Sequence, residues 1–293
     1  MRRLILLSAF AICFLACRKE NSIEPPKNPV NPSTDTAVKS PGPAPDTLDF
    51  IETEPPTLLG VTDSVNEDIG GYYVALPSHY KQDSLKKYPL LVFIPGNGVW
   101  GNGSTDLPLM LKESLPLLLK NKTFPPSFAV DGKHYSFIVF APQLKNYPDY
   151  IDEITSAVAY AKAKYRIDAS RVYITGISLG SIAAGYACAA DPTLYAAVVG
   201  IAGITGDSTG IRSMVNANLP VWAFHNNEDK KIPDSLTKNF VAAYNSFDPA
   251  IPARLTLLPP YGTLNHDAWT KALSPTYKED GKNIYEWMLQ YAR

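Results

Sequence analysis

The segment RVYITGISLGSIAAGYACAADP, residues 171–192, joins a strand-like run to an Ala-rich run through a serine with a glycine on each side. Arg171–Thr175 alternates in the manner of a β-strand, and the Ala-rich run is typical of a helix. The glycines leave room for a sharp turn in which backbone segments approach closely. A serine on such a strand–turn–helix is a candidate nucleophile, so Ser178 is the first residue to test. The alternative interpretation is a Gly-rich turn with an incidental serine.

Short apolar runs alternate with helix-like patterns from about residue 58 onwards. The apolar runs, several of them continuous as in strands buried on both faces, are Pro89–Ile94, Ser136–Ala141, Arg171–Thr175, Ala196–Ile201, Pro220–Phe224 and Ala253–Leu258. Within residues 149–165 the apolar side chains expected on one helical face are Ile151, Ile154, Val158, Ala161 and Tyr165. The alternation predicts an α/β fold with a mostly parallel sheet and helices on both faces. The stretch GYYVALP, residues 71–77, predicts an antiparallel edge strand.

Composition and charge narrow the range of functions. The 293 residues are 45% hydrophobic and 19% charged, so the chain can bury a sizeable core. The 27 basic and 28 acidic residues give a net charge of −1, which does not favour a nucleic-acid partner. The sequence has neither a Cys/His cluster at metal-ligand spacing nor a Gly-rich phosphate loop, so no metal or cofactor is predicted.

The first 17 residues have the pattern of a bacterial signal peptide. Two arginines precede an apolar run that is too short to span a membrane and that ends in FLAC. This ending resembles a lipobox, which implies cleavage before Cys17 and lipidation of its thiol; the alternative is an ordinary secretory signal. With Cys17 acylated, Cys188 is the one thiol left, so no disulfide is predicted. Cys188 is interpreted as a small buried hydrophobe.

A Pro-rich segment follows the signal peptide. Its central stretch, PPKNPVNPSTDTAVKSPGPAPDT, has no aromatic residue and predicts a disordered, extended tether. The predicted organisation is therefore a signal peptide over 1–17, a tether over 18–57 and a folded domain over 58–293. A lipid anchor with a tether predicts a location in the cell envelope of a Gram-negative-type bacterium, with the membrane contacted through the lipid only.

A serine nucleophile needs a base, and the base needs an acid to orient it. In α/β-hydrolases the chain order is serine, acid, histidine, so the base is sought downstream of Ser178. Of the four histidines, only His225 and His266 follow Ser178. His266 stands in PPYGTLNHDAW, directly after the last predicted strand, and is the predicted base. His225 ends a predicted strand and is interpreted as a structural residue beside the acid loop.

The candidates for the acid gather in AFHNNEDKKIP, after the penultimate predicted strand. Asp229, Glu228 and Asp234 all compete there, and Asp207 in GITGDS is a more distant fourth. If the loop is locally extended, Glu228 is expected to project away from the direction of Asp229.

Four blocks resemble the α/β-hydrolase family of carboxylesterases and predicted esterase-peptidases, near polyhydroxybutyrate depolymerase-like and feruloyl esterase-like enzymes. The blocks, which together span most of residues 71–293, are KKYPLLVFIPGNGVWGNGSTDLP, KYRIDASRVYITGISLGS, FHNNEDKKIP, and NHDAWTKAL followed by IYEWMLQ. The resemblance implies an α/β-hydrolase fold in which Ser178 is the nucleophile, Asp229 the acid and His266 the base. It also implies an oxyanion hole built by the backbone N–H groups of Asn97 and Leu179.

The chain departs from the family pattern beside the oxyanion loop. Pro95 stands where the family has histidine, Val99-Trp100 where it has Glu-Arg, and Ser181 where the elbow block ends in glycine. Backbone donors do not depend on these side chains, so we expect the changes to alter substrate choice more than activity. Val99 and Trp100, together with Trp269, are the predicted side chains of the substrate pocket.

From the residues and the resemblance we expect a serine carboxylic-ester hydrolase of the cell envelope that works through a Ser-His-Asp triad and an acyl-enzyme. The expected partner is an ester, either a small molecule or one linked to a polymer such as a carbohydrate or a polyester. Two alternatives stay open: a serine peptidase of the same fold, and a non-catalytic polysaccharide-binding lipoprotein on a hydrolase scaffold.

Overall fold

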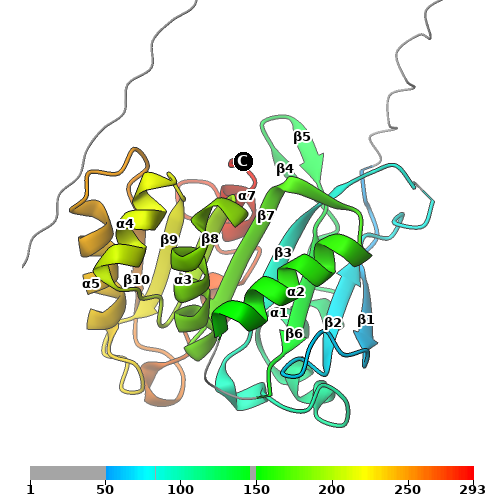
Figure 1. Ribbon diagram of the computed structural model, residues 1–293, viewed down its shortest axis with the longest axis horizontal. Coiled ribbons are helices and arrows are strands. Elements are labelled where there is room, and N and C mark those ends of the chain that lie inside the picture. Colours follow the sequence, from blue (N-terminus) through cyan, green and yellow to red (C-terminus); the bar gives the residue numbers. More distant parts are fainter. Residues whose placement is uncertain (1–50, 83, 146–149) are drawn as a thin grey trace, which may run out of the picture. The chain divides into compact units, whose positions relative to one another are not determined.

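The centre of the computed structural model is one eight-stranded sheet (Figure 1), within the residues described, which are 51–82, 84–145 and 150–293. The strand order is β1-β2-β6-β3-β7-β8-β9-β10. The bounds are Thr57–Val61 for β1, Gly71–Leu76 for β2, Tyr88–Ile94 for β3, Ile138–Gln143 for β6, Ile167–Ile177 for β7, Ala197–Ile201 for β8, Val221–Asn226 for β9 and Arg254–Leu258 for β10. A separate hairpin pairs β4 (Phe128–Val130) with β5 (Lys133–Tyr135).

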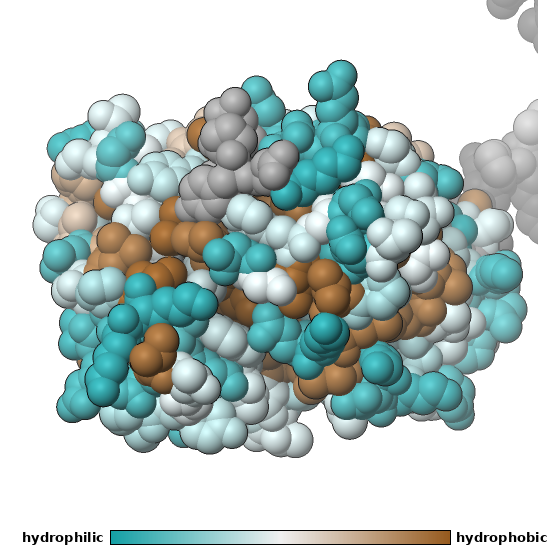
Figure 2. All heavy atoms as spheres, turned by 90° about the horizontal axis from the view of Figure 1, so that it is seen from below, coloured by the Kyte–Doolittle hydropathy of each residue, from teal (hydrophilic) through white to brown (hydrophobic). Residues whose placement is uncertain are grey.

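The strands from β6 to β10 along this order pair in parallel, whereas β1 and β2 are antiparallel additions. Strands β3, β8 and β9 are buried along their whole length, which explains why they appear in the sequence as continuous apolar runs. The loops that follow β3, β7, β9 and β10 lie at the lower edge of the sheet in Figure 1. Figure 2 looks onto this edge, where apolar surface forms a broken band between hydrophilic patches.

Helices cover the sheet on both faces and create a core on each side. The bounds are Ser114–Lys120 for α1, Tyr150–Lys164 for α2, Leu179–Ala190 for α3, Ser208–Asn216 for α4, Asp234–Asn245 for α5, Trp269–Ala272 for α6 and Ile284–Met288 for α7. In Figure 1, α2 to α5 lie in front of the sheet, and α1 and α7 lie behind it. Successive residues of β3 therefore enter different cores: Leu90 and Val92 face one, Leu91 and Phe93 the other. The predicted α/β architecture is confirmed.

The antiparallel side of the sheet differs from the sequence prediction. Strand β2 is antiparallel as predicted, but β1 covers its outer side, so β2 is not an edge strand. Chain segments before the predicted boundary at 57/58 also belong to the domain. Glu52 is 2% exposed, and its carboxylate accepts hydrogen bonds from the His79 backbone N–H (3.0 Å) and from Ser78. The fold thus includes part of the predicted tether.

Helix α2 lies where the periodicity predicts a helix, with one correction to its buried face. Ile154, Val158 and Ala161 are buried as expected, but Ile151 is 38% exposed. Ala157 joins the buried face instead, because the helix presents positions three and four apart to the sheet.

The predicted signal peptide over 1–17, its Cys17, and residues 18–50 of the predicted tether lie outside the described residues. Within the described part of the chain, the helices are all too short or too polar to cross a membrane.

Candidate active site

Ser178 lies at the turn between β7 and α3, in a backbone conformation that few side chains adopt. Its φ is 52° and its ψ is −125°, so the turn is strained at the serine itself. The flanking glycines are required by close backbone contacts. A Cβ at Gly176 would lie 2.3 Å from the carbonyl oxygen of Gly180, and a Cβ at Gly180 would lie 2.2 Å from that of Ile94. The interpretation of the two glycines as space for a sharp turn is confirmed.

The structure brings Ser178, His266 and Asp229 into one hydrogen-bonded line. His266 Nε2 lies 2.8 Å from Ser178 Oγ, and His266 Nδ1 lies 2.6 Å from Asp229 Oδ2. Since a carboxylate only accepts, Nδ1 carries the proton and donates it to Asp229, which leaves Nε2 free to accept from the Ser178 hydroxyl. All three residues are buried. This arrangement can remove the proton from Ser178 and hold the resulting imidazolium beside a negative charge.

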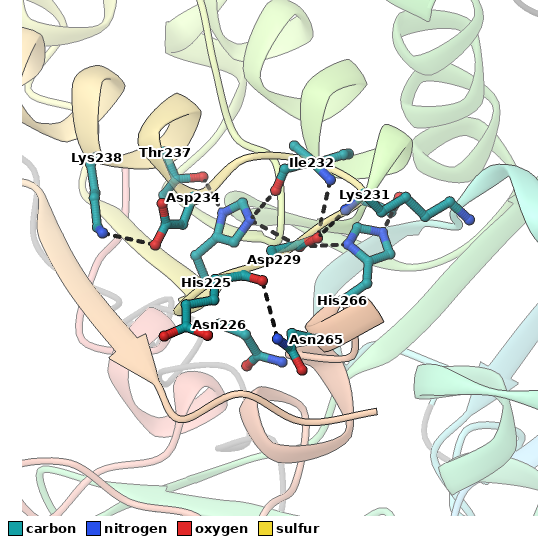
Figure 3. Close-up of polar contacts among 12 residues, drawn as sticks. His225, Asn226, Asp229, Lys231, Ile232, Asp234, Thr237, Lys238, Asn265 and His266 are labelled. Carbon is teal, nitrogen blue, oxygen red and sulfur yellow. Dashed lines mark hydrogen bonds and ion pairs between the residues drawn. The ribbon is translucent and has the colours of Figure 1, made fainter. Parts of the chain in front are cut away.

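Asp229 is held in place from its other side by the backbone of its own loop. Its Oδ1 accepts hydrogen bonds from the N–H groups of Lys231 (2.8 Å) and Ile232 (3.1 Å). The loop after β9 and the loop after β10 are also joined directly (Figure 3). Lys230 N–H donates to Leu264 O at 2.9 Å, and Asn265 Nδ2 donates to Glu228 O at 3.2 Å.

The other three acid candidates are directed elsewhere. Glu228 is exposed and points away from the site, but its φ of 58° shows that the loop turns at this residue and is not locally extended. Asp234, at the start of α5, accepts from Lys238 Nζ at 2.8 Å. Asp207 caps α4 by accepting from the N–H of Gly210.

The predicted oxyanion donors belong to residues that begin helical segments beside Ser178. Asn97 is the first residue of a 3₁₀ turn, Asn97–Val99, and Leu179 is the first residue of α3. The first N–H groups of a helix have no acceptor within the helix and are available to an anion. The oxyanion loop also approaches the serine closely, since a Cβ at Gly96 would lie 3.4 Å from Ser178 Cβ.

Gln143 shapes the oxyanion loop, and sequence reasoning missed it. This buried residue ends β6; its Oε1 accepts from Gly103 N–H at 2.9 Å, and its Nε2 donates to Val99 O at 2.8 Å and Asp106 O at 2.9 Å. These three hydrogen bonds connect the loop that contains Asn97 to the end of β6 at points on both sides of Gly101. One feature of the sequence points to this role: Gln143 ends the apolar run SFIVFAPQ. A glutamine buried with such a strand needs hydrogen-bond partners, and a neighbouring loop can supply them.

The predicted pocket side chains separate into two groups. A cavity of about 420 Å³ adjoins His266, and Trp269 lines it with its ring edge-on to the imidazole, 5.2 Å between ring centres. Val99 is instead buried in one core, and Trp100 packs against the other core and donates from Nε1 to Pro95 O at 3.4 Å. Neither of these two lines the cavity.

The cavity beside His266 is mixed in character. Lys231, Asp267 and Thr263 contribute polar groups, and Tyr261 contributes an aromatic ring. A smaller cavity of about 260 Å³ shares Tyr261 and Asp267 as walls. Burial raises the pKa of nearby Glu113 above its ordinary value, and the negative charge of Asp267 raises it further.

Cys188 is completely buried in the core formed by α2 to α5, and burial raises the pKa of its thiol. This agrees with the interpretation of a small hydrophobe. Across the described residues, His, Cys, Asp and Glu side chains form no group that could hold a metal ion.

Comparison with known proteins finds one family that matches part of the chain. Residues 140–274, which include Ser178, Asp229 and His266, match the phospholipase/carboxylesterase family. A comparison with curated protein sequences gives no match.

Among solved structures, the chain is similar to a thermostable esterase, with 23% identity and a TM-score of 0.60. The similarity covers 80% of this chain and 63% of the esterase, so the chain spans less than two-thirds of the length of that protein. It is similar to fluorophosphonate-binding serine hydrolase F of Staphylococcus aureus, with 13% identity and a TM-score of 0.54 over 80% and 99% of the two chains. It is also similar to an α/β-hydrolase from a deep-sea metagenome library of the Medee basin, with 15% identity and a TM-score of 0.52 over 81% and 98%. At these identities the structural likeness shows the fold. The chain therefore has the α/β-hydrolase fold, and within it residues 140–274 are similar to phospholipases and carboxylesterases.

Proposed function

We propose that the domain hydrolyses carboxylic esters with Ser178 as nucleophile, His266 as general base and acid, and Asp229 as the group that orients His266. The hydrogen-bonded line from Ser178 Oγ to His266 (2.8 Å) and on to Asp229 (2.6 Å) carries this proposal. The backbone N–H groups of Asn97 and Leu179 are the proposed oxyanion donors.

In the first half of the reaction, Ser178 Oγ attacks the ester carbonyl carbon while its proton passes to His266 Nε2. The electron pair of the carbonyl moves onto oxygen, where the two N–H groups stabilise the negative charge. The tetrahedral intermediate then expels the alcohol, which takes the proton from His266 and leaves an acyl group on Ser178. In the second half, His266 removes a proton from water, the hydroxide attacks the acyl-enzyme, and Ser178 regains its proton as the acid leaves.

The cavity beside His266 supports a proposal about the alcohol part of the substrate. His266 must protonate the leaving oxygen, so the alcohol is expected on the side of His266. The lining combines the rings of Tyr261 and Trp269 with the polar side chains of Lys231 and Asp267. An apolar alcohol would remove water from these charged groups without replacing their hydrogen bonds. Carbohydrate esters therefore suit the cavity better than polyester esters.

Labelling with a fluorophosphonate probe tests the proposed function. The probe reacts with a serine whose proton an adjacent base can remove, so the folded protein is expected to be labelled and the heat-denatured protein is not. Prior incubation with an ester substrate is expected to slow the labelling. A non-catalytic binding protein on this scaffold would stay unlabelled, and absence of labelling in the folded protein would contradict the proposal.

We further propose that the chain acts at the cell envelope through a lipid on Cys17. The support is the FLAC motif and the Pro-rich segment behind it. When the chain is expressed in a bacterial host with radiolabelled palmitate, the wild type is expected to carry the label and Cys17→Ala to lose it. The matched control is Cys13→Ala, which removes a thiol of the predicted signal peptide and should retain the label. A wild-type chain released unlabelled into the periplasm would contradict the anchor.

A further inference from the structure

His225 lies in the interior of the site, on the far side of Asp229 from His266. It is the penultimate residue of β9, and its side chain is 0% exposed. Its imidazole lies between Thr237 on α5 and the carboxylate of Asp229 (Figure 3). Because this buried imidazole contacts the acid of the proposed triad, it can affect the geometry of the site. Its hydrogen bonds indicate how.

The partners of His225 fix which of its nitrogens carries a proton. Its Nε2 lies 3.1 Å from Asp229 Oδ2 and 3.0 Å from the carbonyl oxygen of Ile232, and both of these atoms only accept hydrogen bonds. Nε2 must therefore carry a proton and donate it. In the neutral ring Nδ1 is then an acceptor, and the Thr237 hydroxyl, 2.8 Å away, donates to it.

The surroundings of His225 keep this ring neutral. Burial lowers its pKa, and this effect exceeds the opposing influence of the Ile232 carbonyl and of the Asp229 charge. The other titratable groups that face it are Asp234 at the start of α5, which is paired with Lys238, and His266 beyond Asp229. The negative charge of Asp229 is thus left to balance His266 when that residue takes the proton of Ser178.

We propose that His225 is a positioning residue: a neutral imidazole that donates from Nε2 to Asp229 and so holds the carboxylate in the direction of His266. This inference rests on the proposed function, because it assigns the role through Asp229 and His266. Each oxygen of the Asp229 carboxylate then accepts two hydrogen bonds: Oδ1 from two backbone N–H groups, and Oδ2 from two imidazoles.

A matched pair of substitutions separates this role from simple packing. The amide nitrogen of glutamine at position 225 can occupy the place of Nε2 and donate to Asp229, whereas that of asparagine reaches only the place of Nδ1. We expect His225→Asn to lower kcat by about 10- to 100-fold with little change in KM, since a hydrogen bond to a charged group is lost. His225→Gln is expected to stay within about tenfold of wild type. His134→Asn, an exposed position of β5, serves as the surface control.

The pH profile provides a readout that a packing defect would not move. With one donor fewer, the Asp229 carboxylate holds the protonated His266 more strongly, so a higher pH is needed to free the base. The acidic limb of kcat/KM is therefore expected to move to higher pH in His225→Asn and to return towards the wild-type position in His225→Gln. Equal kcat values and equal acidic limbs in both variants, with both shown to be folded by thermal melts, would overturn the proposal.

The wild-type protein offers a second test that does not depend on a variant folding. Nitrogen-15 NMR of the ring nitrogens is expected to find His225 neutral at pH 7, with the proton on Nε2. A proton on Nδ1, or a charged ring at pH 7, would refute the assignment. Absence of esterase activity in wild type would instead contradict the proposed function and leave this NMR result unaffected.

Discussion

Replacement of Ser178 by alanine is expected to reduce the hydrolysis of short p-nitrophenyl esters by on the order of 10⁴-fold or more, as loss of a triad nucleophile does. The substitution removes the Oγ that lies 2.8 Å from His266 Nε2 and leaves the base without a group to deprotonate. The remaining activity would come from the oxyanion donors and substrate binding alone. Steady-state rates of the purified variant, with active-site titration of the wild type, measure the effect.

Ser181 provides the matched control for this substitution. It lies on the first turn of α3 and is buried, and its Oγ has no hydrogen-bond partner among the described residues. Ser181→Ala is therefore expected to keep activity within about tenfold of wild type. If Ser178→Ala retained full activity, or if Ser181→Ala lost it instead, the assignment of the nucleophile would be wrong.

The parts of the fold and site that the sequence predicts are those with a local cause. The turn at Ser178 is one of them, because a strand, two glycines and a helix stand within a few residues of each other. The parallel strands β3, β8 and β9 are another, because they are buried along their whole length and burial on both faces demands apolar residues in a continuous run. His266 could also be predicted, since only two histidines follow Ser178 and one of them ends a strand.

The parts that the sequence did not predict depend on contacts between distant segments. Strand β1 is only five residues long and mostly exposed, and it forms because its backbone pairs with β2. Gln143 acts on a loop about 40 residues away in the chain, so nothing in its neighbourhood reveals its partners. The resemblance to the family's oxyanion loop predicts Val99 in the pocket wall, whereas Val99 is buried in a core because of how this loop packs against the sheet.

The choice among the acids illustrates the same limit. The local sequence does not distinguish Asp229 from Glu228 and Asp234, and only the family resemblance favours Asp229. The deciding features are the φ of 58° at Glu228, which turns its side chain to solvent, and the pairing of Asp234 with Lys238. Neither feature can be derived from the spacing of three carboxylates in one loop.

Substitution of Asp229 by asparagine is expected to lower kcat by about 10³- to 10⁴-fold, with little change in KM for a small ester. The backbone N–H groups of Lys231 and Ile232 require an oxygen at the Oδ1 position, so the new amide nitrogen must take the place of Oδ2. There it donates towards His266 and forces the ring proton onto Nε2, the nitrogen that should accept from Ser178.

The same amide nitrogen would also face the Nε2–H of His225, which makes a contact between two donors and adds to the loss. The comparison variants are Glu228→Gln, Asp234→Asn and Asp207→Asn, assayed side by side with thermal melts to exclude unfolding. Each is expected to stay within about tenfold of wild type, because Glu228 is exposed, Asp234 pairs with a surface lysine, and asparagine still caps α4 at position 207. Near-wild-type kcat in Asp229→Asn, together with its loss in one of the other three, would assign the acid to that residue and refute this account of the site.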